Sequence, residues 1–362
     1  MRRSVLFALS FVEPYSIFLP SPIVFFRALY YYICDNYFTE RRMEMKNCYP
    51  LMLSAPLKDY IWGGERLKTE YGFKSEQKIA EAWVLSNRAD GQSLVLNGEL
   101  AGKTLSCAIE EFGPGCLGKN AEAFRCFPLL IKLIDAKDKL SVQVHPDDSY
   151  ALEHEGEFGK TEMWYVLDAL PGAQLIYGLK TEVTEDILKE YVYSDKITEL
   201  CRFVPVKKGD VFFIPAGTVH AIGEGMLIAE VQQNSNITYR VSDYGRLGND
   251  GKPRALHKEK ALQVINRKPT PLFSEHKTIK GKEFTEKQLA DCRYFKVSEL
   301  ELNGQTEIRE NDSFVSLIVL EGEAALSWCG GETNIRKADS IFIPAALKVS
   351  ISGKAKILVS KV

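Results

Sequence analysis

The chain has 362 residues, of which 45% are hydrophobic and 26% charged, and its formal net charge is -2. A chain of this size can bury a large core, and it lacks the basic excess of nucleic-acid-binding or membrane-surface proteins. Its eight cysteines include no C-x-x-C pair, which argues against a disulfide framework or a thiolate zinc site and favours a reducing compartment. We therefore expect a cytoplasmic protein with no nucleic-acid or membrane partner.

The first 44 residues differ from the rest of the chain. They open with two arginines and a short apolar run, as a signal peptide does, but an acidic residue and a proline interrupt the run and no small-x-small cleavage site follows. Arg27 splits the second apolar run, so neither run reaches the roughly 18–20 apolar residues of a membrane span. We interpret residues 1–44 as an upstream extension, with the folded domain beginning near Met43 or Met45.

From about Leu51 the pattern is that of short strands separated by turns. "KTLSCAIEEFG", which begins at Lys103, predicts a short helix. Two pairs of strands follow, one within "FPLLIKLIDAKDKLSVQVHP" from Phe127 and one within "TEMWYVLDALPGAQLIYGL" from Thr161. The chain is therefore expected to be mainly β.

Helical spacing interrupts the strands at about residues 181–203. Thr184 predicts an N-cap, and Ile187, Leu188 and Tyr191 form one stripe. Strand patterns resume after it. We interpret this segment as a small helical insertion.

An internal repeat follows. "KKGDVFFIPAGTVHAI" from Lys207 and "RKADSIFIPAALKVSI" from Arg336 align without a gap. Two informative residues of the first copy are replaced in the second, Gly217 by Ala346 and His220 by Val349. Two copies of one β unit predict two small barrels of similar build, of which only the first carries chemistry.

The segment "INRKPTPLFSEHKTIKGKEF" from Ile265 has turn-forming residues, many charges and little periodicity, which is typical of a linker. We therefore divide the chain into the extension at 1–44, a catalytic domain at 45–265 and a degenerate C-terminal domain at 266–362.

One predicted strand has an unusual polar face. Val142 and Val144 point to one side, and Gln143 and His145 point to the other, because strand side chains alternate. A glutamine and a histidine on one face indicate either a solvent-exposed edge or two side chains aimed at a common ligand.

The segment "GDVFFIPAGTVHAI" has the spacing G-x5-P-x-G-x2-H, with Gly209, Pro215, Gly217 and His220 at the defined positions. Proline and glycine predict a tight turn, after which the returning strand points His220 into the barrel. This spacing resembles the second conserved motif of cupin barrels, which usually take further ligands from an earlier pair of strands. Glu162, at the start of such a strand, would complete the set.

Two imidazoles, a carboxylate and an amide oxygen, from Gln143, His145, Glu162 and His220, make a site without sulfur. Such a site suits Zn2+, Fe2+ or Mn2+. The remaining histidines are in charged loops, and we interpret them as surface residues: His154, His257 and His276.

The segments "PLLIKLIDAKDKLSVQVHPDD", "GKTEMWYVL", "IPAGTVHAIG" and "EVQQNSNITYRVSDYGR" resemble the signature segments of the type I mannose-6-phosphate isomerases, zinc-dependent members of the cupin superfamily. The resemblance covers residues 50–362, and the Gln-x-His pair is discriminating because most other metal cupins have His-x-His there. It implies the short bacterial form: two jelly-roll barrels, one zinc ion per chain, a sugar phosphate substrate, and a monomer or homodimer.

The resemblance also implies roles for individual residues. Its zinc ligands fall on Gln143, His145, Glu162 and His220, and its active-site arginine falls on Arg240. Three further positions line the sugar-phosphate pocket in the family: Lys132, Ser141 and Lys160.

Interconverting mannose 6-phosphate and fructose 6-phosphate moves a proton between C1 and C2 through an enediol, so the site needs a Lewis acid, an acid/base and a phosphate clamp. Lys132 follows an apolar run and is expected to need an anionic partner. Arg240 stays charged and would bind phosphate or stabilise an oxyanion. Glu230, flanked by apolar residues, is expected either to have a raised pKa and act as the base, with Lys160 as the competing candidate, or to be an ionic partner of Arg240 or Lys160.

Two other functions are compatible with a metal-binding cupin. An oxygenase would use an open Fe2+ site, but Gln143 and the lysine and arginine set argue against it. A non-catalytic sugar-binding cupin would have little reason to keep the full ligand set.

Overall fold

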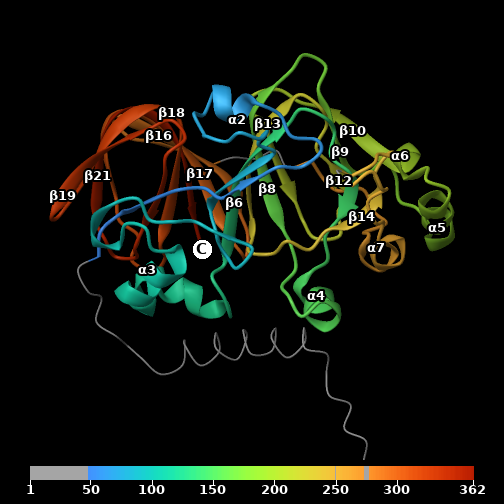
Figure 1. Cartoon of the computed structure of the whole chain (residues 1–362), viewed down its shortest axis with the longest axis horizontal. Coiled ribbons are helices and arrows are strands. Elements are labelled where there is room, and N and C mark those ends of the chain that lie inside the picture. Colours follow the sequence, from blue (N-terminus) through green and yellow to red (C-terminus); the bar gives the residue numbers. More distant parts are fainter. Residues whose placement is uncertain (1–47, 249, 273–276) are drawn as a thin grey trace, which may run out of the picture. The chain divides into compact units, whose positions relative to one another are not determined.

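The computed structural model describes residues 48–248, 250–272 and 277–362, and these residues form a mainly β protein (Figure 1). The expected extension at 1–44 and His276 lie outside the described residues. No helix in the described ranges has both the length and the apolarity needed to cross a lipid bilayer. The prediction of a mainly β fold is thus confirmed.

Two antiparallel sheets make up the part of the chain that carries the motifs. The six-stranded sheet has the order β11 (Val211–Ile214), β8 (Glu162–Ala169), β13 (Met226–Gln233), β6 (Leu129–Ala136), β3 (Glu81–Leu85), β2 (Leu57–Lys58). The five-stranded sheet has the order β10 (Cys201–Pro205), β9 (Gln174–Leu179), β12 (His220–Ala221), β7 (Val142–Val144), β14 (Tyr239–Ser242). Trp164 and Ile228 of the first sheet and Leu175 and Tyr177 of the second belong to one buried cluster, so the sheets pack face to face.

The C-terminal part forms one eight-stranded sheet. Its order is β1 (Leu51–Leu53), β20 (Ser340–Ile343), β18 (Val315–Trp328), β21 (Val349–Lys361), β17 (Lys296–Ile308), β16 (Phe284–Asp291), β15 (Thr278–Lys280), with β19 (Gly331–Arg336) paired to β18. Side chains from β17, β18, β19, β20 and β21 meet in one buried cluster, so this sheet curls around its own core. The ladders in the described residues do not close into complete barrels, and each unit is an open, jelly-roll-like arrangement of sheets.

The helices are short and lie outside the sheets (Figure 1). They are α2 (Arg66–Thr69), α3 (Leu105–Phe112), α4 (Asp148–His154), α5 (Glu185–Tyr193), α6 (Ile197–Leu200) and α7 (Lys258–Val264); three 3-10 turns span Gly98–Leu100, Pro114–Leu117 and Lys119–Ala123, and a small hairpin joins β4 (Asn87–Arg88) to β5 (Gly91–Gln92). The predicted insertion is confirmed as α5 and α6, and the Thr184 hydroxyl accepts a hydrogen bond from the Ile187 N–H at 3.3 Å. The predicted linker is not entirely irregular, because it contains β15.

The internal repeat is visible in the backbone. The Lys207 N–H donates to the Asp210 carboxylate at 2.9 Å in the turn before β11, and the Arg336 N–H donates to the Asp339 carboxylate at 2.8 Å in the turn before β20. In both copies an aspartate carboxylate therefore accepts a hydrogen bond that stabilises the turn, and a strand and a proline follow it.

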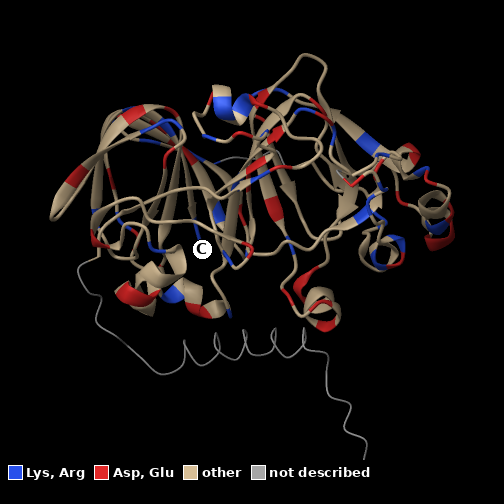
Figure 2. Ribbon diagram, in the orientation of Figure 1, with Lys and Arg blue, Asp and Glu red and all other residues tan. Residues whose placement is uncertain are grey.

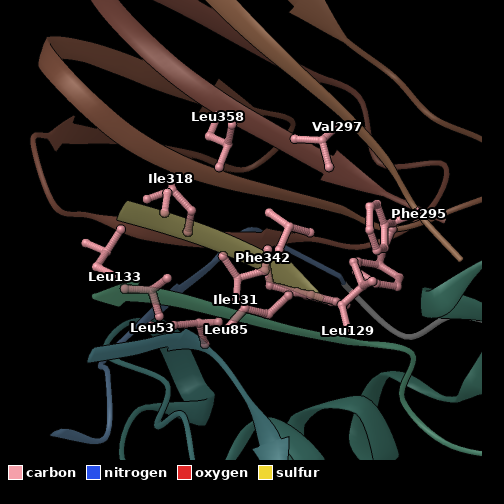
Figure 3. Packing of buried hydrophobic residues seen from close by; sticks show 14 of the residues in the cluster. Leu53, Leu85, Leu129, Ile131, Leu133, Phe295, Val297, Ile318, Phe342 and Leu358 are labelled. Atoms are coloured by element: carbon pink, nitrogen blue, oxygen red, sulfur yellow. The ribbon is translucent and has the colours of Figure 1, made fainter. Parts of the chain in front are cut away.

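The two β units share a large apolar interface, part of which Figure 3 shows. Ile131 and Leu133 of β6 face Ile318, Phe342 and neighbouring side chains of the eight-stranded sheet. In addition, β1 pairs with β20 and so belongs to the C-terminal sheet. The predicted boundary near residue 265 assigns this strand to the catalytic domain.

Candidate active site

The four predicted metal ligands come together between the two facing sheets. Gln143 and His220 pair across β7 and β12, and His145 follows β7 on the same strand face. Glu162 begins β8 of the opposite sheet. Its two carboxylate oxygens lie 3.6 Å from His145 Nε2 and 3.3 Å from His220 Nε2.

Backbone carbonyls orient both imidazoles. His145 Nδ1 lies 2.8 Å from the Ile237 oxygen, and His220 Nδ1 lies 2.8 Å from the Thr218 oxygen. With Nδ1–H donating to a carbonyl, each Nε2 keeps its lone pair and faces Glu162. Burial lowers the pKa of His145 well below its usual value and that of His220 to about 4, so both rings are neutral, which is the ligating form.

These residues fit a metal ion. His145 Nε2 and Glu162 Oε1 are buried without a hydrogen-bond partner in the structure, which costs free energy unless something binds them. The ligand atoms of His145, Glu162 and His220 all lie within 4.8 Å of one another. The Gln143 amide nitrogen is 3.3 Å from His220 Nε2, so the amide would have to turn over to present its oxygen to a metal.

A row of buried charges adjoins this cluster. Lys160 Nζ is 2.8 Å from Glu162 and 3.9 Å from Glu230, and Lys132 Nζ is 3.1 Å from Glu230. Trp164 Nε1 donates to the other Glu230 oxygen at 3.1 Å. Charged residues of both signs are interspersed along the described chain (Figure 2), but these ones are unusual because they lie inside the sheets.

The expected raised pKa of Glu230 is wrong. Burial alone would raise it, but the charges of Lys132 and Lys160 and hydrogen bonds from Lys132 and Trp164 outweigh burial and lower the pKa of Glu230 to about 2. Of the two lysines that flank this carboxylate, Lys160 was an expected alternative partner, but the apolar sequence neighbours of Glu230 did not reveal Lys132. Glu162 behaves in the opposite way, since burial raises its pKa to about 8 against the opposing effect of Lys160.

Lys132 has the anionic partners that its position predicted, and they are carboxylates of the protein. It lies opposite Glu230 in the ladder between β6 and β13, and Glu81 is 3.7 Å from its Nζ. Burial would lower the pKa of Lys132, but these two carboxylates outweigh it and raise the pKa. Ser141, also predicted to meet the phosphate, is buried immediately before β7.

Sequence reasoning did not single out Glu81, which belongs to this row. It begins β3, the strand next to β6, and its carboxylate accepts a hydrogen bond from Trp83 Nε1 at 2.7 Å. The sequence did place a charged residue at the start of the buried strand "EAWVL", which could have indicated a buried ionic partner. It could not identify that partner, because Lys132 is distant in the chain.

Arg240 flanks the metal ligands on the other side. It is opposite Gln143 in the ladder between β14 and β7, so the two side chains share a face. One terminal nitrogen donates to the Ala255 carbonyl at 2.8 Å, and within the described residues its guanidinium has no carboxylate within 4.0 Å. Burial and the nearby Arg254 charge lower its pKa.

Of the histidines predicted to be at the surface, His154 is exposed, but His257 is half-buried. Its Nδ1 accepts a hydrogen bond from the Arg240 backbone N–H at 3.1 Å. His257 therefore supports the strand that carries Arg240.

Comparison with known proteins identifies similar chains. Two family models match, "Phosphomannose isomerase type I, catalytic domain" over residues 51–165 and "Mannose-6-phosphate isomerase, cupin domain" over residues 285–362. The mannose-6-phosphate isomerase of Streptococcus mutans is 38% identical over 83% of this chain and 93% of that protein. The mannose-6-phosphate isomerase ManA of Bacillus subtilis is 38% identical over 86% of this chain and 98% of that protein. A crystal structure of the mannose 6-phosphate isomerase from Bacillus subtilis matches with a TM-score of 0.81 and 35% identity, covering 86% of this chain and 99% of that one.

Proposed function

The chain belongs to the type I mannose-6-phosphate isomerases, and from that membership we propose that it works with one zinc ion bound between its two facing sheets. The enzyme catalyses the reversible isomerisation of D-mannose 6-phosphate and D-fructose 6-phosphate. The observation that supports the metal is the buried cluster of His145, Glu162 and His220, with two ligand atoms that have no hydrogen-bond partner.

In this proposal Gln143, His145, Glu162 and His220 hold the ion, and their mixture of nitrogen and oxygen donors suits zinc. When bound, zinc supplies a Lewis acid that stabilises negative charge developing on the substrate oxygens. The carbonyls that hold both Nδ1 atoms fix the imidazoles for this purpose.

The proton transfers are assigned to the row of buried charges. Lys160 lies between Glu162 and Glu230, next to the ligand cluster, and this position supports a role at a substrate bound there. We propose Lys160 as the acid/base. Glu230, proposed from the sequence as the base, remains ionised at neutral pH because of its low pKa and is a weaker base, so we give it the task of orienting Lys160 and Lys132.

We propose that Arg240 binds the phosphate or a developing oxyanion, since its guanidinium pairs with no carboxylate in the described residues. Lys132 and Ser141 are proposed to assist at the phosphate, although Lys132 would do so while paired to Glu230 and Glu81.

A coupled assay on mannose 6-phosphate, with and without chelator, tests the proposal. Chelation is expected to abolish turnover and added zinc to restore it, with about one zinc per chain by elemental analysis. A zinc-loaded protein that converts no substrate would contradict the activity. Full activity in protein shown to be metal-free would contradict only the metal.

We further propose a cytoplasmic enzyme, a monomer or homodimer, with the domain division at residue 265. Cys116 and Cys201 are buried as thiols, which agrees with a reducing compartment. Light scattering coupled to size-exclusion chromatography distinguishes the two oligomeric states.

A further inference from the structure

The two β units repeat the same strand pairings, so positions in the second unit can be matched to the active site of the first. Ile214 of β11 pairs with Glu162 of β8, and its repeat equivalent Ile343 of β20 pairs with Val315 of β18. Val315 therefore occupies the place of the metal-ligating glutamate.

The same comparison gives the second-unit positions that correspond to other residues of the active site. The second-unit equivalents of Gln143, His220, Lys132 and Glu230 are, in that order, Ile308, Val349, Ser298 and Val359. Glu81, opposite Ile134 on β6, corresponds to Glu286, opposite Leu300 on β17. Aliphatic side chains thus stand at three of the four metal-ligand positions, and the fourth, that of His145, corresponds to Glu310. Within the described residues, no group of three or more metal-binding side chains is found close together in the second unit.

The second unit is nevertheless open at this place. A cavity of about 410 Å³ is lined by Ser298, Ile308, Val315 and Val359, four of the equivalents of the active-site residues, and by Glu286. This volume is within the range of pockets that hold small organic molecules. We propose that the cavity is a second binding site, separate from the active site, for a small organic anion with an apolar body.

The apolar part of this assignment comes from the cavity wall. Leu300 and Val315 are buried in the wall, and Phe284 and Ile308 are half-buried there. A wall of this kind stabilises the apolar part of a ligand through removal of its surface from water.

The anionic part comes from the charges around the opening. Three acidic residues there are each paired with a lysine: Asp291 with Lys296 at 4.0 Å, Glu307 with Lys348 at 2.7 Å, and Glu310 with Lys361. Glu286 accepts a hydrogen bond from the Ser298 hydroxyl at 2.6 Å. Arg309 instead contacts only the Asn311 amide oxygen, at 3.2 Å, and neither Arg309 nor Lys277 has a carboxylate within 4.0 Å in the described ranges. Among the described residues of the lining, two cations, Lys277 and Arg309, thus stand without an ionic partner against one carboxylate without one, that of Glu286, so the unpaired charges sum to +1.

The fluorescent probe 8-anilinonaphthalene-1-sulfonate has this chemistry, an apolar aromatic body with one anionic group. Titrated into the full-length, zinc-loaded enzyme, it is expected to bind with one saturable site per chain and to remain bound when mannose 6-phosphate is added. The neutral analogue N-phenyl-1-naphthylamine is expected to bind at least about tenfold more weakly, because a charge-assisted contact is lost.

Two variants locate the probe. Thr306→Trp fills the cavity from β17 and is expected to abolish binding, whereas Asn303→Trp, on the opposite face of the same strand, is expected to leave it unchanged. Arg309→Ala is expected to raise the Kd about tenfold, and Arg336→Ala, an exposed arginine of the same sheet, to have no effect. Isomerase activity should be unchanged in all four, which verifies folding.

Binding that persists in both Thr306→Trp and Arg309→Ala, or displacement of the probe by mannose 6-phosphate, would overturn the second site. Equal affinity for the neutral analogue would overturn the anionic assignment. Since the isomerase assay is run on the same samples, failure of this proposal is separable from failure of the proposed metal mechanism.

Discussion

At the scale of single residues, the active site is a row of buried charges of alternating sign. Glu81, Lys132, Glu230, Lys160 and Glu162 follow one another with gaps of 3.7, 3.1, 3.9 and 2.8 Å between nitrogen and oxygen atoms. Each charge is tolerated inside the sheets because its neighbours have the opposite sign. Removing one member leaves its neighbours buried with less compensating charge.

Lys132→Met is therefore expected to lower the free energy of unfolding by about 3–5 kcal/mol. The substitution keeps the volume of the side chain but leaves Glu230 and Glu81 without their shared cation. Urea unfolding measures the loss, with exposed Lys354→Met as a control that changes stability by less than about 0.5 kcal/mol. The double variant Lys132→Met, Glu230→Gln should recover part of the loss. An unchanged urea midpoint in Lys132→Met would show that the buried charges of the row do not stabilise one another.

Arg240→Ala and His145→Ala are expected to fail in different ways. His145→Ala removes a ligand and should lose the metal together with the activity. Arg240→Ala should keep one zinc per chain and reduce kcat/KM by at least about 100-fold, since an ionic contact to the substrate is lost. Arg267→Ala, which removes an exposed arginine paired to Glu185, is the control. Near-normal kinetics in Arg240→Ala would refute its assigned role.

At the scale of elements, the second copy of the repeated turn has kept its backbone but lost its glycines. Gly209 and Gly217 have φ of 88° and 84°, and their equivalents Ala338 and Ala346 have φ of 79° and 63°. Alanine is disfavoured in this left-handed region because Cβ approaches the carbonyl oxygen. The fold therefore tolerates an unfavourable backbone conformation at Ala338 and Ala346.

Ala338→Gly and Ala346→Gly are each expected to raise the free energy of unfolding by up to about 1 kcal/mol, because relief of the left-handed conformation exceeds the entropy cost of glycine. Thermal unfolding followed by circular dichroism measures the gain. Ala325→Gly, inside β18, should destabilise the protein by about 0.5–1 kcal/mol. A loss of stability in both turn variants would contradict the argument.

Local sequence patterns predicted the parts of the site that lie within one strand or one turn. Alternation placed Gln143 and His145 on one face, and the proline-glycine turn aimed His220 at them. Which strands become neighbours depends on contacts distant in the chain. For this reason the Glu81–Lys132 pair and the low pKa of Glu230 became apparent only in the folded sheet. The pairing of β1 with β20 was hidden for the same reason.

At the scale of the whole described chain, the two β units are joined by a continuous apolar core (Figure 3). Phe342 stacks on Phe314 with ring centroids 5.2 Å apart and packs near Ile131 of β6. Because the interior face of β6 carries Lys132 and the other face rests on this core, the second unit supports the strand that supplies the active site. We expect the two units to unfold together in one transition.

Phe342→Ala is expected to destabilise the protein by about 3–5 kcal/mol through loss of buried area and the cavity left behind. Calorimetry should still show a single transition at a lower Tm, with kcat nearly normal well below it. Ile279→Ala, whose side chain is 61% exposed on β15, is the matched control and should have little effect. Two separated transitions, only one of them shifted, would show that the units are independent.

The pairing of Leu51 with Phe342 also has a consequence for how the enzyme is made. On the ribosome, the first strand emerges long before the strand that will receive it. Until then its N–H and C=O groups form an open edge, which invites pairing with another nascent chain. Contacts so far apart in sequence slow folding, so completion of the native sheet must await the synthesis of β20. Truncated chains that end before β20 are thus expected to aggregate, even though every proposed catalytic residue has already been synthesised.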